Sequence, residues 1–360
     1  MDYNRKLVLS DGTVFFGNGF GSDKEVIAEV VFNTGMTGYQ DVLTDPSYYK
    51  QMVCMTYPLI GNSGINDDSN ESKHGAAALI VKQYCEMPSN WRSSKTLADF
   101  LDERNIPGLC DVDTRALMIK IRRVGVIRAI IVDVNVATAD AVAKINAAPS
   151  ARDHVKQVAP KNSYTISTPN KKFRIVFIAF NEKNEIINEL VARRCEVIVV
   201  PYNSKSADID ALNPDGIVIG NGPGNPVDIP EVLPVIRNLQ TQYPLFSVCL
   251  GHQLFALANG ATTSKMKFGH HGHNVSVKDL TNGRTFVTTQ SHSYQVDKET
   301  LKEANLELTH FCLNDDTVEG LKHIKHPAFS VSYKPEAHLG PNDSKYLFDQ
   351  FIASLSCPKC

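Results

Sequence analysis

The second half of the chain alternates between short, continuous apolar runs and longer helical patterns. Apolar runs at 174–179, 196–200, 216–219 and 245–248 are separated by helical patterns at 185–194 and 231–243. A strand that is apolar at every position is buried on both faces, which is typical of a parallel sheet covered by helices. We therefore expect residues 173–360 to form an α/β domain with a mostly parallel sheet flanked by helices. Later strands are expected at 273–278, 285–289, 306–311 and 328–333, and a closing helix at 344–355.

Residues 1–150 follow a different pattern, with short strand-like runs, turns and two helices. Thr96 is a candidate cap for the first helix, and the second places Leu117, Ile121 and Val124 on one face. We expect a compact α+β domain here. Residues 151–172 lack periodicity and are rich in Pro, Asn, Ser and Thr, so they are the best candidate for a linker.

Length, composition and charge indicate an ordinary folded protein. The 360 residues suggest two or three domains, and 42 % apolar with 21 % charged residues excludes wholesale disorder. The net charge of -2 gives no bulk electrostatic reason to bind nucleic acid or an anionic membrane. No apolar run approaches the roughly 20 residues that cross a bilayer, and no signal-peptide core follows the N-terminus. We expect a cytoplasmic protein whose eight cysteines are reduced.

The segment from Phe246 to Gln253 carries the sharpest local signal. An apolar strand ends at Cys249, and Gly251 opens a helix two residues later. This is the layout of a nucleophile elbow, a tight turn that raises a reactive side chain above the carboxyl edge of a sheet. Amides at the helix start lower the pKa of a thiol and stabilise a developing oxyanion. A buried core cysteine is the alternative interpretation.

A glycine-rich loop at 220–226 follows the preceding strand. Its glycines allow the backbone to approach a ligand closely, although the loop alone is equally compatible with an ordinary turn. Adjacent parallel strands would bring this loop and the elbow to one carboxyl edge, where such folds bind ligands.

The two features together resemble class I glutamine amidotransferases, thiol enzymes that hydrolyse glutamine and deliver ammonia elsewhere. From about residue 6 to 355 the chain is similar to the carbamoyl-phosphate synthetase small chain. The motifs that carry this resemblance lie at 33–40, 43–48, 57–62, 113–115, 267–272 and 335–337. The resemblance implies a subunit that hydrolyses L-glutamine and passes ammonia to a large synthetase subunit, whose product feeds arginine and pyrimidine synthesis. Residues 1–150 would supply most of the docking surface.

The resemblance also implies roles for individual residues. Cys249 would attack the glutamine amide to form a thioester, and Glu336 would orient a histidine that shuttles protons. Ser47 would reach in from the other domain. The substrate would be bound by Ser47, Gly222, Gly224, Leu250, Gln253, Ser291, Ser293 and Tyr294.

Two departures from the family pattern bear on activity. Lys334 stands where the family has its catalytic histidine, and a lysine is ordinarily a cation that cannot accept the thiol proton. Ser291 and Ser293 replace an asparagine and a glycine in the substrate segment, and Gly220 and Asn225 are milder changes. Loss of general acid-base help costs roughly 10²–10⁴-fold, so glutamine hydrolysis is expected to be impaired. The alternative is a decayed paralogue that only stabilises or regulates an ammonia-using synthetase.

Other histidines and cysteines are weaker candidates. His338, four residues after Lys334, is expected to be a solvated loop residue, and His252 a packing residue at the helix start. Neither the group His270, His271 and His273 nor the CxxC of Cys357 and Cys360 has the ligands of a metal site, so no metal is expected. The chain has no G-x-x-x-x-G-K-[ST] loop, so ATP and Mg²⁺ are expected on the large subunit.

Overall fold

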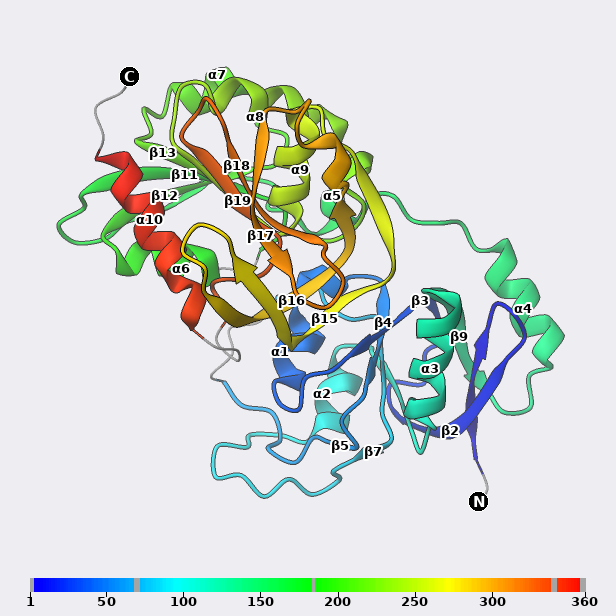
Figure 1. Ribbon diagram of the computed structural model, residues 1–360. Coiled ribbons are helices and arrows are strands. Elements are labelled where there is room, and N and C mark those ends of the chain that lie inside the picture. The colour runs from blue at the N-terminus through cyan, green and yellow to red at the C-terminus, as the bar shows by residue number, and fades with distance from the viewer. Residues whose placement is uncertain (1–2, 68–71, 183–184, 338–341, 357–360) are drawn as a thin grey trace. The chain divides into compact units, whose positions relative to one another are not determined.

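A computed structural model describes residues 3–67, 72–182, 185–337 and 342–356. The chain divides into two compact units (Figure 1). Unit 1 comprises residues 1–151 together with 267–272, and unit 2 comprises residues 152–266 and 273–360.

Unit 1 is built on a closed barrel of seven strands in the order β1-β2-β8-β6-β4-β3-β9. The barrel strands are β1 (Arg5–Leu9), β2 (Val14–Gly21), β3 (Val26–Asn33), β4 (Gln51–Met55), β6 (Ala78–Ile80), β8 (Pro107–Cys110) and β9 (Ile127–Asp133). The short strands β5 (Leu59–Ile60) and β7 (Gln83–Tyr84) form a separate pair. The helices are α1 (Tyr39–Thr44), η1 (Pro46–Tyr48), α2 (Leu97–Glu103), α3 (Thr114–Val124) and α4 (Thr138–Ala147).

Local signals in the sequence account for two helix ends in unit 1. Thr96 caps α2 by accepting a hydrogen bond from the Asp99 amide, as predicted. In α3, Leu117 and Ile121 are fully buried, but Val124 is 51 % exposed. The prediction for Val124 was wrong because α3 ends at this residue, where Gly125 turns the chain away with a φ of 96°.

Unit 2 contains a ten-stranded sheet in the order β10-β12-β11-β13-β14-β19-β18-β17-β15-β16. The five strands from β12 to β19 are parallel, which confirms the predicted α/β class. Strands β10, β18, β17 and β15 pair antiparallel with their neighbours. The strands are β10 (Tyr164–Ile166), β11 (Phe173–Ala179), β12 (Cys195–Pro201), β13 (Gly216–Ile219), β14 (Leu245–Val248), β15 (Thr263–Asp279), β16 (Thr285–Val296), β17 (Leu306–Cys312), β18 (Val318–His323) and β19 (Ala328–Val331).

Helices cover both faces of the parallel strands (Figure 1). On one face, α6 and α10 pack Leu190 and Phe348 against apolar strand residues. On the other face, α8 and α9 bury Ile236 and Leu254. The helices are α5 (His154–Val158), α6 (Glu185–Ala192), α7 (Ser206–Asp210), η2 (Pro226–Asp228), η3 (Pro230–Val232), α8 (Leu233–Leu239), α9 (Leu250–Ala258), η4 (Lys298–Thr300), η5 (Asp343–Lys345) and α10 (Tyr346–Leu355).

The structure adds regular elements that the sequence pattern did not indicate. The segment 151–172, expected to be a linker, contains α5 and β10, and β10 forms one edge of the sheet. Strand β15 begins ten residues earlier than expected, and β16 continues seven residues further. Strand β18 was not predicted.

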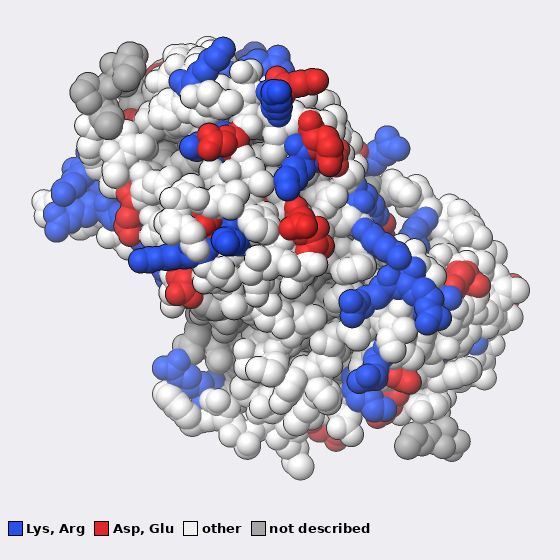
Figure 2. Space-filling model, viewed as in Figure 1, with Lys and Arg blue, Asp and Glu red and all other residues white. Residues whose placement is uncertain are grey.

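The surface of unit 2 carries charges of both signs. Figure 2 shows basic and acidic side chains interspersed on its visible face, in agreement with the net charge of -2. None of the described helices combines the length and the apolar character needed to cross a membrane.

We predict that Leu254→Ala destabilises unit 2 by about 2–5 kcal/mol, because Leu254 is fully buried between α9 and the sheet. The control Leu280→Ala, at a residue that is 47 % exposed, should change stability by less than about 0.5 kcal/mol. Amide hydrogen exchange in β13 and β14 measures both effects. Equal losses in the two variants would contradict this account of the core.

Candidate active site

Cys249 occupies the turn between β14 and α9 in a strained conformation. Its φ of 54° and ψ of -110° are seldom adopted by residues other than glycine. Its amide donates to the Val331 carbonyl in β19 at 2.9 Å, and its carbonyl accepts from the Gln253 amide at 3.2 Å. The predicted strand-to-helix turn is therefore present, held to the neighbouring strand and to its own helix. Cys249 is 2 % exposed.

Gly251 lets α9 begin close against the end of β13. Its amide donates to the Gly220 carbonyl at 3.1 Å, and a Cβ at this position would lie 2.5 Å from the Ile219 oxygen. Gly222 is equally crowded, because a Cβ there would lie 2.8 Å from Leu250 Cδ2. The structure thus brings the glycine-rich loop against the elbow.

Gly224 lies further along the same loop and faces α5. Its φ is +91°, and an added Cβ would lie 3.1 Å from His154 Cβ. Both the backbone conformation and the close approach favour glycine here.

Glu336 is completely buried, and a chain of two asparagines leads to its carboxylate. Asn221 Nδ2 donates to Glu336 Oε1 at 3.4 Å. Asn181 Nδ2 in turn donates to Asn221 Oδ1 at 2.9 Å and to the Asn221 carbonyl at 2.8 Å. Sequence reasoning did not single out either asparagine; the only available signal is a polar residue just after an apolar strand.

Lys334 begins the turn that carries Glu336. Its amide donates to the Thr289 carbonyl at 2.9 Å, and its carbonyl accepts from the Ala337 amide at 3.4 Å. The residue is 5 % exposed, which is unusual for lysine because an ammonium group loses its hydration on burial.

Strand β16 carries three of the predicted substrate-binding residues. Ser291 is 6 % exposed, and its hydroxyl has no hydrogen-bond partner within the described part of the chain. Ser293 and Tyr294 are half-buried. Gln253 Nε2 donates to the Tyr294 carbonyl at 2.9 Å, so the structure brings α9 and this part of β16 together.

The histidines of α9 and β16 are engaged with protein groups. His252 Nδ1 lies 2.8 Å from Ser330 Oγ, and burial lowers the pKa of His252 to about 3. His292 Nδ1 donates to the Tyr294 carbonyl at 2.9 Å, while Nε2 lies 3.0 Å from Gln290 Oε1. His252 is therefore a packing residue, as predicted. His338 lies outside the described residues.

Ser47 belongs to unit 1, where it is the second residue of η1. Its amide donates to Asp45 Oδ1 at 2.9 Å, and its hydroxyl makes no hydrogen bond to any described residue. Because Cys249 belongs to unit 2, contact between Ser47 and a substrate on Cys249 stays a prediction.

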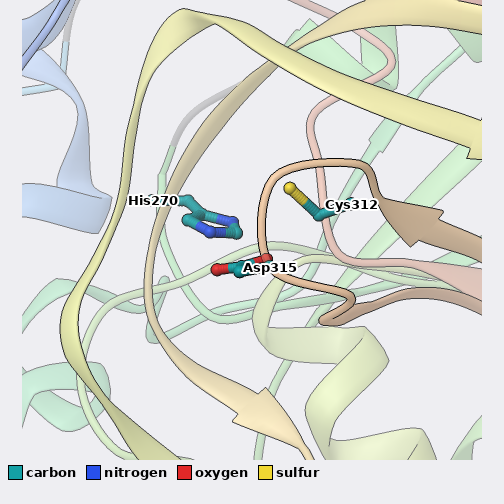
Figure 3. A group of neighbouring side chains, drawn as sticks. All are labelled: His270, Cys312 and Asp315. Carbon is teal, nitrogen blue, oxygen red and sulfur yellow. The ribbon is translucent and has the colours of Figure 1, made fainter.

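Four other cysteines are poorly suited to act as nucleophiles. Burial raises the pKa to about 11 for Cys195 and to about 12 for Cys54, Cys110 and Cys312. Figure 3 shows Cys312 with Asp315, whose negative charge adds to this effect. His270, also drawn there, lies in the segment 267–272 of unit 1, so these three residues define no site within either unit.

We predict that iodoacetamide at pH 7.5 alkylates Cys249 faster than Cys54, Cys110, Cys195 and Cys312, because the raised pKa values keep those four as thiols. Peptide mass spectrometry over time measures each site, and Cys249→Ser identifies the fast phase. If Cys249 stayed unmodified, the thiol would be inaccessible and could not be a nucleophile.

Comparison with known proteins covers both units. The family described as carbamoyl-phosphate synthase small chain, CPSase domain, matches residues 7–131, and glutamine amidotransferase class-I matches residues 179–354. The carbamoyl phosphate synthase small chain of Bacillus caldolyticus is 50 % identical over 352 residues, which are 98 % of this chain and 96 % of the relative. That of Oceanobacillus iheyensis is 50 % identical over 359 residues, covering 99 % and 97 %.

A third relative, from Halalkalibacterium halodurans, is described as a pyrimidine-specific small chain. It is 48 % identical over 356 residues, which are 99 % of this chain and 98 % of the relative. With two family matches in sequence order and relatives that align from end to end, this chain belongs to the carbamoyl phosphate synthase small-chain family.

Proposed function

We propose that this chain is the glutamine-hydrolysing small subunit of a carbamoyl-phosphate synthase and that Cys249 is its nucleophile. The observation that carries the proposal is the elbow itself. Cys249 is held at a φ of 54° at the start of α9, in a chain that matches both parts of the family. Strained backbone conformations cluster at active sites, which favours catalysis for this residue.

In the proposed reaction, the Cys249 thiol attacks the side-chain amide of L-glutamine. Ammonia leaves, a thioester remains, and water releases glutamate. The ammonia passes to a large synthetase subunit, which holds ATP and Mg²⁺ and uses bicarbonate. This division of labour is supported by the small-chain names of the relatives.

The substrate-binding residues belong to the proposal as well. Gly222 and Leu250 lie beside the elbow, and Gln253 is bonded to Tyr294. We assign the glutamine site to Ser47, Gly222, Gly224, Leu250, Gln253, Ser291, Ser293 and Tyr294.

The proposal places the chain in the cytoplasm, where thiols are kept reduced. Support comes from the six cysteines of the described residues, none of which forms a disulfide with another.

We predict that the chain, combined with its large subunit, makes carbamoyl phosphate from glutamine, and that Cys249→Ser abolishes this reaction. Synthesis from ammonium chloride should continue in the variant, because ammonia bypasses the small subunit. Carbamoyl phosphate formation with each nitrogen source is the measurement. If the wild-type complex used only ammonium, the chain would be a binding partner without hydrolytic activity.

We further predict that Lys334→His raises the glutaminase kcat/KM at least tenfold. An imidazole at this position can accept the thiol proton and protonate the leaving ammonia better than a carboxylate, because the ordinary imidazole pKa is closer to neutral pH. Glutamate release is measured at saturating and limiting glutamine. An unchanged or lower rate would show that histidine is not the missing group.

A further inference from the structure

We infer that Glu336 is the general base of this site and that Lys334 stabilises negative charge on the reacting groups without moving a proton. This inference rests on the proposed glutamine hydrolysis and assigns its proton transfers. It differs from the arrangement that the sequence resemblance implies, in which a carboxylate only orients a histidine.

Two described histidines, one beside the elbow and one in the substrate segment of β16, are engaged with other protein groups. His252 is three residues after Cys249, but its Nδ1 is 2.8 Å from Ser330 Oγ, and its low pKa, about 3, makes it a weak proton acceptor. His292 uses Nδ1 on the Tyr294 carbonyl and Nε2 on Gln290, with Ser332 Oγ also at 3.2 Å from Nε2.

The turn that carries Glu336 follows β19, the strand that pairs with β14 and so adjoins the nucleophile. Val248 and Val331 are register partners in the parallel pair of β14 and β19, and the Cys249 amide donates to the Val331 carbonyl. The turn from Lys334 to Ala337 follows directly after this strand. The two residues and the thiol therefore emerge at the same carboxyl edge.

The surroundings of Glu336 suit a carboxylate that must move a proton. It is completely buried, and Asn221 Nδ2 approaches Oε1 at 3.4 Å, which is longer than a strong charge-assisted bond. Asn181 orients this amide, so the carboxylate is held by a neutral donor.

Lys334 has the complementary chemistry. An ammonium group has no lone pair to accept a proton, but its charge stabilises a thiolate and an oxyanion in a site shielded from water. Lys334 is 5 % exposed, so its charge is little screened by solvent.

Glu336 and Lys334 are sufficient to balance protons and electrons in both steps of the reaction. The Sγ–H proton moves to Glu336 as Sγ bonds to the glutamine amide carbon and the C=O π pair moves to oxygen. Glu336 then protonates the amide nitrogen, the C–N bond breaks, and ammonia leaves a thioester. Water next gives a proton to Glu336 and attacks the thioester, and the departing sulfur takes that proton back. Lys334 stays protonated throughout.

The first test is Glu336→Gln, which keeps the size of the side chain and removes its basicity. The glutaminase kcat/KM should fall by roughly 10²–10⁴-fold. Glu307→Gln, at an exposed carboxylate paired with Lys322, and His338→Asn should both leave the rate unchanged. The inference is overturned if Glu336→Gln stays within threefold of the wild type, or if His338→Asn loses activity to the same extent.

The pH dependence of kcat/KM gives a readout that a structural role would not produce. A base must be unprotonated to act, so activity falls as pH drops through its pKa. Glu336→Gln should therefore remove the acidic limb of the wild-type profile, and Lys334→His should add a limb near the ordinary imidazole pKa of about 6.5. A Glu336→Gln variant that kept the wild-type limb would overturn the assignment.

Alkylation of Cys249 tests Lys334 without any glutamine. Lys334→Met should move the pH of half-maximal alkylation upward by at least one unit, and Lys334→Arg should restore it, because the cation favours the thiolate. If Lys334→Met left the pH of half-maximal alkylation unchanged, the proposed charge role of Lys334 would be overturned. Glutamine hydrolysis that persists in Glu336→Gln would contradict this inference alone, whereas a wild type unable to hydrolyse glutamine would contradict the proposed function as well.

Discussion

The hydrogen bond from the Cys249 amide to the Val331 carbonyl is the contact on which the site depends. It extends the parallel pairing of β14 and β19 by one residue beyond β14, into the elbow. This bond holds the strained elbow against a central pair of strands. The turn with Lys334 and Glu336 begins three residues after β19 ends, so the nucleophile and the charged groups are both anchored to this strand.

Electrostatics explains why Lys334 and Glu336 are best considered together. Either charge buried alone would lose its hydration at a cost of several kcal/mol. Lys334 and Glu336 are of opposite formal charge, and both are nearly inaccessible to solvent. The asparagines at 181 and 221 add hydrogen bonds without adding charge. A histidine can be buried neutral, so Lys334 changes the charge balance of the site as well as its proton chemistry.

The sequence predicted those features that depend on local pattern. Continuous apolar strands gave the parallel sheet, Thr96 gave a helix start, and the strand-to-glycine spacing gave the elbow. Strand β18 was missed because its apolar residues, Val318 and Leu321, are too few to show a period. The closed barrel of unit 1 depends on pairings between distant strands, which no local pattern reveals. Asn181 was missed because its partner, Asn221, is forty residues away.

The segment 267–272 has a consequence for how the chain can be divided. It interrupts unit 2 in sequence but belongs to unit 1, where its Lys267 carbonyl accepts from the Val126 amide and its His271 carbonyl accepts from the Thr34 amide. The backbone therefore crosses between the units three times. A single genetic crossover after residue 151 would separate the barrel from six residues of its own structure, so the two halves are constrained to be inherited as one piece.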